Sequence, residues 1–146
     1  MEITLKQLLL EIDNKWEIPS LNDEEAAIRS AAEEFDLSLK TIVDRFPSDQ
    51  LRLMPQKVWE RLKNTDSTKT ESFYDMVQTI QKHQKKDPTY EKDWKNIKDG
   101  FKDDVKKMKA PIVVRHKNEY ILLAGNARLM VAKAMNVPPF VYLFSI

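Results

Sequence analysis

The chain changes character near residue 110, and the segment that follows restricts the possible folds more than any other part. Two apolar runs, PIVVR at 111–115 and YILLA at 120–124, flank a short polar stretch of turn composition. This pattern predicts a β-hairpin. A helix is expected from about Asn126 to Met135, and the apolar run at 137–144 predicts a closing strand. The segment therefore predicts the order strand–strand–helix–strand.

The residues before this segment have the pattern of successive helices. Asn22 and Glu25 stand at capping-box spacing and predict one helix start, and Ser38 predicts another. A further helix is expected to begin at Pro55, since proline suits the first helical turn. The N-terminal part is therefore expected to be helical.

An apolar residue recurs every three or four positions between residues 90 and 108, which predicts a long helix leading into the strand segment. We therefore expect an α+β protein, with a helical region at 1–86 and a small α/β unit at 87–146. Charge is divided unevenly along the chain. Residues 1–54 carry 6 basic and 12 acidic groups, whereas residues 55–146 carry 18 basic and 11 acidic groups. The basic part could face a phosphate-rich partner, or the two parts could simply pack together.

Composition excludes several classes of site. The chain has no cysteine, which excludes disulfides, thiolate metal sites and a cysteine nucleophile. Its two histidines, His83 and His116, lie far apart in sequence and neither has a second ligand at metal-site spacing, so no metal site is predicted. No apolar run is long enough to span a bilayer, and the start of the chain has an acidic residue, Glu2, where a signal peptide would be basic. A cytoplasmic protein without a membrane partner is expected.

Gly125 is one of only two glycines in the chain and stands between a predicted strand and a predicted helix. Free backbone N–H groups and the helix dipole make such a junction suitable for an anion. Glycine allows a sharp turn and a close approach, Asn126 can cap the helix or donate a hydrogen bond, and Arg128 offers a forked guanidinium. The residues indicate a phosphate site at Gly125, Asn126 and Arg128, and the alternative is a glycine that serves only as a turn beside a solvated arginine.

The stretch PIVVRHKNEYILLAGNARLMVAKAMNVPPFVYL resembles the core of the ParB/sulfiredoxin superfamily, and the likeness extends over about residues 88–146. It is also similar to ParB-like nuclease domain proteins of tailed phages that contain LLAGNTRLMVA. The resemblance implies a phage protein whose Gly125–Arg128 turn contacts the phosphates of CTP, ATP or ADP, with Mg²⁺ as the accompanying ion. It also implies a nuclease or nucleotide-dependent activity in the host cytoplasm.

The residues of the turn limit what activity this resemblance can imply. Sulfiredoxin chemistry needs a cysteine, which the chain lacks, so that activity is excluded. Glu119 is the only carboxylate after Ala110 and is therefore the candidate catalytic residue, because metal binding or proton transfer requires an acidic group. The alternative is a non-catalytic module that binds DNA or a protein partner, such as a phage regulatory factor acting on its host.

A second pattern, at residues 28–46, resembles a helix-turn-helix motif. Its apolar positions and paired alanines fall where two helices would cross closely. In such a motif Lys40, Thr41 and Arg45 would be placed to contact DNA. Asp36 replaces the usual glycine of the turn, and acidic residues surround the motif. An ordinary helical hairpin is the alternative interpretation.

Overall fold

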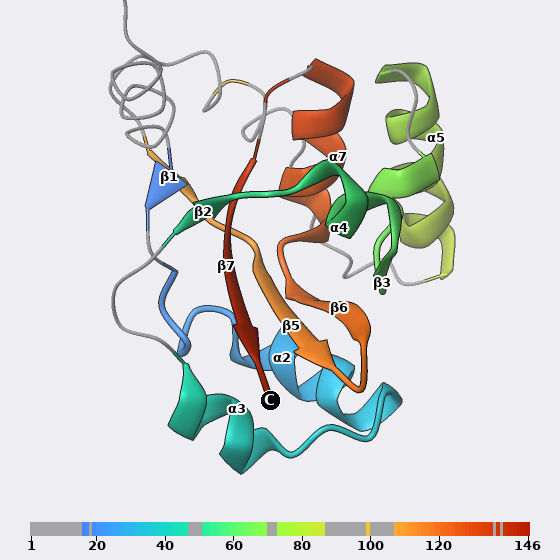
Figure 1. The fold of residues 1–146 in the computed structure, drawn as a ribbon. Helices are drawn as coiled ribbons and strands as arrows, with labels where there is room; N and C mark the ends of the chain where they lie inside the picture. The colour runs from blue at the N-terminus through green and yellow to red at the C-terminus, as the bar shows by residue number, and fades with distance from the viewer. Residues whose placement is uncertain are drawn as a thin grey trace, which may run out of the picture.

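A five-stranded sheet with helices on both faces forms the centre of the chain (Figure 1). The computed structural model describes residues 16–17, 19–46, 51–69, 73–86, 99, 107–135, 137 and 139–146. The strand order is β2-β7-β5-β6-β3, and a separate two-stranded sheet pairs β1 with β4. Helix and strand are thus mixed, and the predicted α+β class is confirmed.

The strands are short at the edges and long at the centre. Their bounds are β1 Trp16–Glu17, β2 Arg52–Leu53, β3 Leu62–Lys63, β4 Met108–Lys109, β5 Ile112–His116, β6 Glu119–Ala124 and β7 Phe140–Ser145. The helices are α2 Glu25–Glu34, α3 Leu39–Arg45, α4 Gln56–Glu60, α5 Phe73–Lys86 and α7 Asn126–Met135, with a 3₁₀ turn at Ser67–Lys69.

The predicted hairpin is present and occupies the middle of the sheet. Strands β5 and β6 are antiparallel, and β7 returns through α7 to lie parallel to β5. Lys117 and Asn118 form the two-residue connection with φ angles of +49° and +65°. Two positive φ angles in succession give the turn twist that suits a tight hairpin, and asparagine tolerates that conformation well. The predicted order strand–strand–helix–strand is confirmed.

The expectation of a purely helical region at 1–86 was incomplete, because that region also contributes three strands. Strand β2 pairs with β7 and strand β3 pairs with β6, so both edges of the main sheet come from it. The helix predicted from Pro55 ends at Glu60, since the next residues enter β3. Two-residue strands are too short to show a periodic pattern in a sequence.

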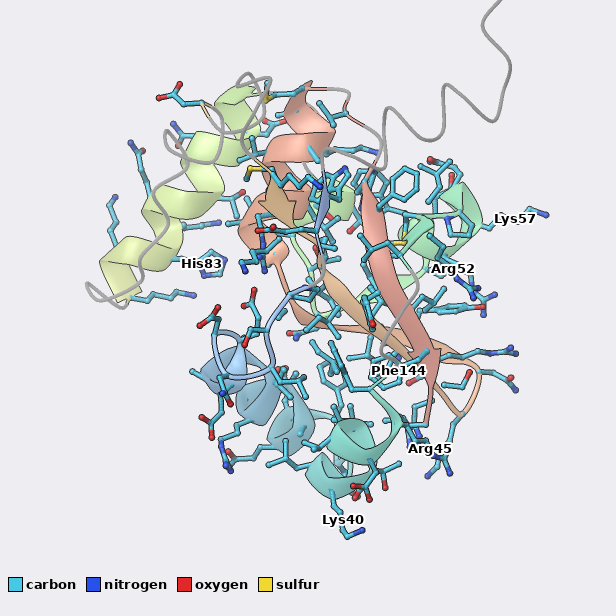
Figure 2. The ribbon with its side chains drawn as sticks, turned by 90° about the vertical axis from the view of Figure 1, so that its left-hand side faces the viewer. Lys40, Arg45, Arg52, Lys57, His83 and Phe144 are labelled. Carbon is cyan, nitrogen blue, oxygen red and sulfur yellow. The ribbon has the colours of Figure 1, made fainter. Side chains whose placement is uncertain are left out.

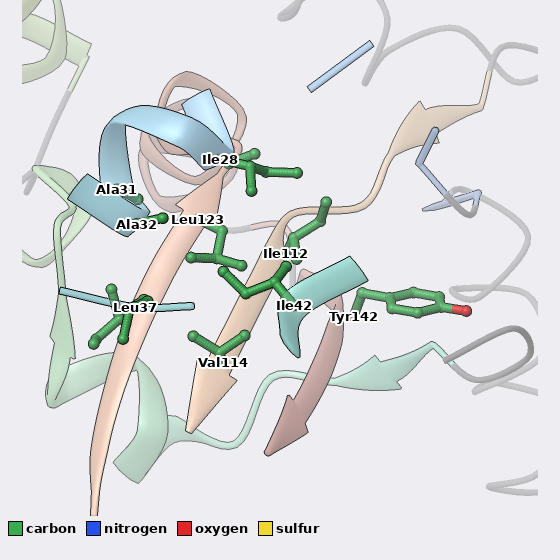
Figure 3. Packing of buried hydrophobic residues seen from close by; sticks show 11 residues of the cluster. Ile28, Ala31, Ala32, Leu37, Ile42, Ile112, Val114, Leu123 and Tyr142 are labelled. Atoms are coloured by element: carbon green, nitrogen blue, oxygen red, sulfur yellow. The ribbon is translucent and has the colours of Figure 1, made fainter. Parts of the chain in front are cut away.

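The two faces of the sheet carry different helices. One face packs against α2 and α3 through a cluster of buried apolar side chains (Figure 3): Ile28, Ala31, Ala32, Leu37, Ile42, Ile112, Val114, Ile121, Leu123, Ala124 and Tyr142. The other face packs against α4 and α7 through Met54, Val58, Trp59, Leu62, Val113, Leu122, Leu129 and Val141. Strand residues alternate between the two clusters, as the period of two in a strand requires.

The predicted helix caps had different outcomes. The Ser38 hydroxyl accepts a hydrogen bond from the backbone N–H of Thr41 at 3.2 Å, which confirms the cap of α3. The capping box at Asn22 was wrong, because α2 begins at Glu25 after Glu24 and has no side-chain cap. The Glu25 carboxylate of the predicted box pairs instead with Arg29. The helix predicted over 90–108 falls mostly outside the described residues, and its predicted end was wrong, because Met108 and Lys109 form β4.

Within the described ranges, no helix is long and apolar enough to cross a membrane.

Candidate functional site

A pocket of about 700 Å³ opens where β6 ends and α7 begins. Its walls come from the α2 helix, the loop before the 3₁₀ turn, His83 of α5 and the strand–helix junction. The lining residues are Glu24, Ala27, Ser30, Ala31, Asn64, Thr65, Asp66, His83, Leu122, Leu123, Ala124, Gly125, Asn126, Ala127 and Arg128. The three residues predicted to hold a phosphate therefore border one cavity.

Gly125 is required at this junction by its backbone and by its neighbour. Its φ angle is +106°, a conformation that residues with a side chain rarely adopt. A Cβ atom built on Gly125 would lie 2.8 Å from the Cβ and 2.9 Å from the Cα of Pro111. The Gly125 carbonyl accepts a hydrogen bond from the N–H of Leu129 at 3.0 Å, which begins α7. The glycine thus has a structural role whether or not a ligand binds.

Asn126 fastens the junction to the loop that precedes the 3₁₀ turn. Its Oδ1 atom accepts hydrogen bonds from the Thr65 hydroxyl at 2.8 Å and from the Asp66 backbone N–H at 2.9 Å. Its Nδ2 atom donates to Asp66 Oδ2 at 3.0 Å. Asn126 therefore does not act as a simple helix cap. It holds an acidic side chain at the pocket wall.

Arg128 faces a carboxylate from a remote part of the chain. Its Nη2 atom lies 2.6 Å from Glu24 Oε1, and the two side chains are only 14% and 16% exposed. A charge-assisted hydrogen bond of this length in a sheltered place is strong. The predicted phosphate-binding guanidinium thus already holds an anion supplied by the protein itself.

Asp66 and His83 form a second polar pair in the pocket. The Nε2 atom of His83 lies 3.0 Å from Asp66 Oδ2, the same oxygen that receives the Asn126 hydrogen bond. Figure 2 shows His83 projecting from α5 toward the side of the molecule that carries α2. An imidazole oriented by a carboxylate is suited to accept or donate a proton.

No family model, curated protein or solved structure matches the chain. The pocket brings together two carboxylates, a guanidinium and an imidazole. Across the ranges that the structure describes, no group of three or more His, Asp or Glu side chains is arranged to hold a metal ion. A divalent ion here would need ligand atoms from a bound phosphate as well.

Sequence reasoning missed Glu24, Asp66 and His83. Glu24 lies 104 positions from Arg128, and Asp66 lies 60 positions from Asn126. Neither carboxylate forms part of a local motif with its partner, so no spacing in the sequence could have identified the pairs.

The structure does not bring Glu119 to the pocket. Glu119 begins β6 and Gly125 follows its end, which separates them by about 20 Å at the rise of an extended strand. The Glu119 carboxylate instead lies 2.6 Å from the Nζ atom of Lys63. The hydrogen bond from Lys63 and its positive charge lower the pKa of Glu119. Its candidate catalytic role has no support from its position.

Replacing Glu119 by glutamine is expected to have a small, pH-dependent effect on stability. The pKa of Glu119 is depressed below its ordinary value of 4.5 in the folded protein, so its stabilising effect is present above about that pH. The effect is lost as pH falls through the folded pKa. Thermal unfolding followed from neutral pH downward should show the difference between wild type and variant at neutral pH and a progressive loss of it below pH 4.5, with less difference in high salt.

The control for this variant is Glu33→Gln, since Glu33 is exposed on α2 and has no ion pair within the described part of the chain. The control should show no comparable loss. A Glu119→Gln variant that abolishes any activity assigned to the pocket would contradict this placement and restore Glu119 as a catalytic candidate.

The residues predicted to contact DNA lie on α3. Lys40 and Arg45 are exposed, and Lys40 Nζ lies 2.7 Å from Asp44 Oδ2 on the same helix. Thr41 is partly buried. Helices α2 and α3 do form a hairpin, and Asp36 adopts a φ angle of +53° in its turn. The apolar side of the hairpin packs on the sheet, which an ordinary helical hairpin would also do. Contact with DNA stays a prediction.

Proposed function

We propose that the pocket binds a phosphate-bearing ligand, in the first instance a nucleotide with Mg²⁺, at the Gly125–Arg128 turn. The observation that carries this proposal is the ion pair between the Glu24 carboxylate and Arg128 in the first turn of α7. An anion already occupies the position that a phosphate oxygen would take. The pocket volume of about 700 Å³ lies in the range of ordinary small-ligand sites.

Binding would exchange one anion for another on Arg128. A guanidinium donates in a forked geometry that fits a phosphate at least as well as a carboxylate. Release of Glu24 would leave its carboxylate near the bound phosphate, where two like charges repel. A Mg²⁺ ion removes this conflict, because it is commonly bound by one or two carboxylates together with phosphate oxygens. Glu24 and Asp66 are the carboxylates that line the pocket.

The Asp66–His83 pair supports an enzymatic form of this proposal. An imidazole next to bound phosphate could take a proton from water during hydrolysis of a phosphoanhydride or a phosphodiester. Asn126 would hold Asp66 in position for that step through its 3.0 Å hydrogen bond. Nuclease and nucleotide-hydrolase activities both fit this arrangement, in line with the resemblance to ParB-like nuclease domain proteins.

A non-catalytic module that binds DNA or a protein partner is the second candidate. The observation that favours it is that Asn126 and Arg128 already have partners within the protein. On this interpretation the Glu24–Arg128 pair only fastens α2 to α7, and the pocket has no ligand of its own.

The Glu24→Gln variant separates the two candidates. Removing the competing carboxylate should tighten binding of a metal-free nucleotide about tenfold. A tenfold change in affinity corresponds to about 1.4 kcal/mol. The measurement is a thermal-shift titration of CTP, ATP, ADP and GTP, with and without Mg²⁺. A ligand at 100 times its dissociation constant adds about 2.7 kcal/mol to the stability of the protein.

Glu25→Gln is the matched control, because Glu25 is the next residue and pairs with Arg29 on the exposed surface. It should bind nucleotides as the wild type does. If no nucleotide stabilises the wild type or the Glu24→Gln variant, the nucleotide proposal fails and the binding-module candidate stands.

A further inference from the structure

Two arginines and a tyrosine lie together near the β5–β6 turn, on the sheet face that packs against α4 and α7. Arg115 of β5 and Tyr120 of β6 are directly opposite residues in the antiparallel pair, so their side chains lie on the same face. Leu62 of β3 is the partner of Tyr120 in the parallel pair of β3 and β6, and Arg61 immediately precedes it. We call Arg61, Arg115 and Tyr120 the arginine–tyrosine surface.

The helices leave this end of the face incompletely covered. Buried residues such as Val113 and Leu122 mark the part that α4 and α7 cover, whereas Tyr120 and Leu143 are only partly buried at its margin. Arg61 and Arg115 are exposed. An aromatic ring is therefore accessible between two cationic side chains.

The two arginines lie close to the same ring. The Cζ atoms of Arg61 and of Arg115 are each 5.9 Å from the centre of the Tyr120 ring. Asn118 helps to hold them, since Arg115 Nη2 donates to its Oδ1 at 3.0 Å and Arg61 Nη2 donates to its carbonyl at 3.5 Å. Two cations gathered over one ring repel each other unless an anion joins them.

The described residues supply no carboxylate for either arginine. Neither takes part in an ion pair of the residues that the structure describes. Glu119 is the nearest carboxylate along the strand, but it alternates to the opposite face and is bound to Lys63 at 2.6 Å. The surface thus combines an accessible aromatic ring with two cations that have no anionic partner there.

We infer that the arginine–tyrosine surface binds single-stranded nucleic acid. A base would stack on Tyr120 while phosphates on either side pair with Arg61 and Arg115, which is how strand-binding surfaces combine stacking with charge. Two further basic residues lie on the same side of the molecule. Arg52 shares the face through its pairing with Val141, and Figure 2 shows Arg52 and Lys57 extending outward on the α4 side. Arg52 is level with Val141 near the start of β7, whereas Arg115 is level with Ser145 at its end, so Arg52 does not adjoin the arginine–tyrosine surface.

This surface is distinct from the pocket at Gly125. Arg128 lies on α7, and Glu24 reaches it from the start of α2, whereas the arginine–tyrosine surface lies at the hairpin end of the sheet. Strand binding can therefore be measured without a nucleotide and in variants of the pocket.

The test is fluorescence anisotropy of labelled oligothymidine and oligouridine of about 15 nucleotides, with a duplex of the same length as a comparison. The protein is the full chain, at about 50 mM and about 200 mM salt. Arg61→Gln and Arg115→Gln should each weaken binding about tenfold and make it less sensitive to salt. Tyr120→Leu keeps an apolar side chain and should weaken binding about 5- to 100-fold.

Arg29→Gln is the matched control, because it removes one positive charge from an exposed helix elsewhere. Its affinity should equal that of the wild type. Preference for oligouridine or for oligothymidine would identify RNA or DNA as the natural strand, and either result supports the proposal. Folding of each variant is checked by its thermal unfolding midpoint, and Arg115→Lys should restore part of the binding.

Three results would overturn the proposal. The first is no binding of either strand at the lower salt concentration, which would leave a protein as the partner of this surface. The second is equal or tighter binding of the duplex. The third is a loss with Lys40→Gln or Arg45→Gln that matches or exceeds the loss with the surface variants, which would place the nucleic acid on α3.

Discussion

Replacing Gly125 by alanine is expected to lower the free energy of unfolding by about 4 kcal/mol. The residue has a φ angle of +106°, and an alanine side chain would be strained there by about 1–3 kcal/mol. The new methyl group would also meet the ring and backbone of Pro111 at 2.8 and 2.9 Å, and overpacking costs about 1–3 kcal/mol more. Pro111 sits next to buried strand β5 and has little room to move.

Urea denaturation measures this loss directly, and the thermal midpoint should fall by roughly 8–16 °C for a chain of this size. Lys117→Gly is the control, because Lys117 is exposed and has a positive φ angle of +49° in the hairpin turn. Glycine accepts that conformation, so stability should change by no more than about 0.5 kcal/mol. A loss below about 1 kcal/mol for Gly125→Ala would mean that the junction relaxes and that its conformation is not enforced.

Replacing Arg128 by alanine is expected to abolish nucleotide binding, with a loss of at least about 100-fold. The variant removes the only cation of the Gly125–Arg128 turn and leaves Glu24 facing any incoming phosphate. It should also lower the free energy of unfolding by about 1–3 kcal/mol, because a carboxylate that is only 16% exposed loses its partner. Calorimetric titration measures the binding, and urea denaturation measures the stability.

The double variant Glu24→Gln/Arg128→Ala separates the two effects. Without the unpaired carboxylate, stability should return to within about 1 kcal/mol of the wild type, whereas binding should stay lost. Arg128→Lys keeps the charge without the forked geometry and should bind nucleotide with intermediate affinity. Nucleotide binding that survives in the Arg128→Ala variant would contradict the proposed site.

The features that were predicted correctly are those set by neighbouring residues. The hairpin follows from two apolar runs around a polar turn, and α7 follows from Gly125 and the periodic apolar residues after it. The Ser38 cap depends on a hydroxyl and a backbone group only three positions apart. Each of these requires no knowledge of the rest of the chain.

The features that were missed depend on contacts between distant residues. Strands β2 and β3 have two residues each and exist because β7 and β6 offer unpaired backbone groups at the sheet edges. Of the predicted site, Gly125, Asn126 and Arg128 do border one pocket, but Glu24, Asp66 and His83 reach it from three separate elements. The predicted capping box failed because α2 begins only at Glu25, so Asn22 lies too far before the helix to cap it.

The origin of the two edge strands also bears on how the chain can be divided. A fragment of residues 87–146 would keep the hairpin, α7 and β7, yet it would lose the strands that cover β6 and β7. Exposed edges of this kind invite pairing with other copies and so favour aggregation. The same cut would remove the anion that neutralises Arg128 and the loop that Asn126 fastens. The N-terminal region therefore covers the sheet edges of the C-terminal unit, and the two are not separable modules.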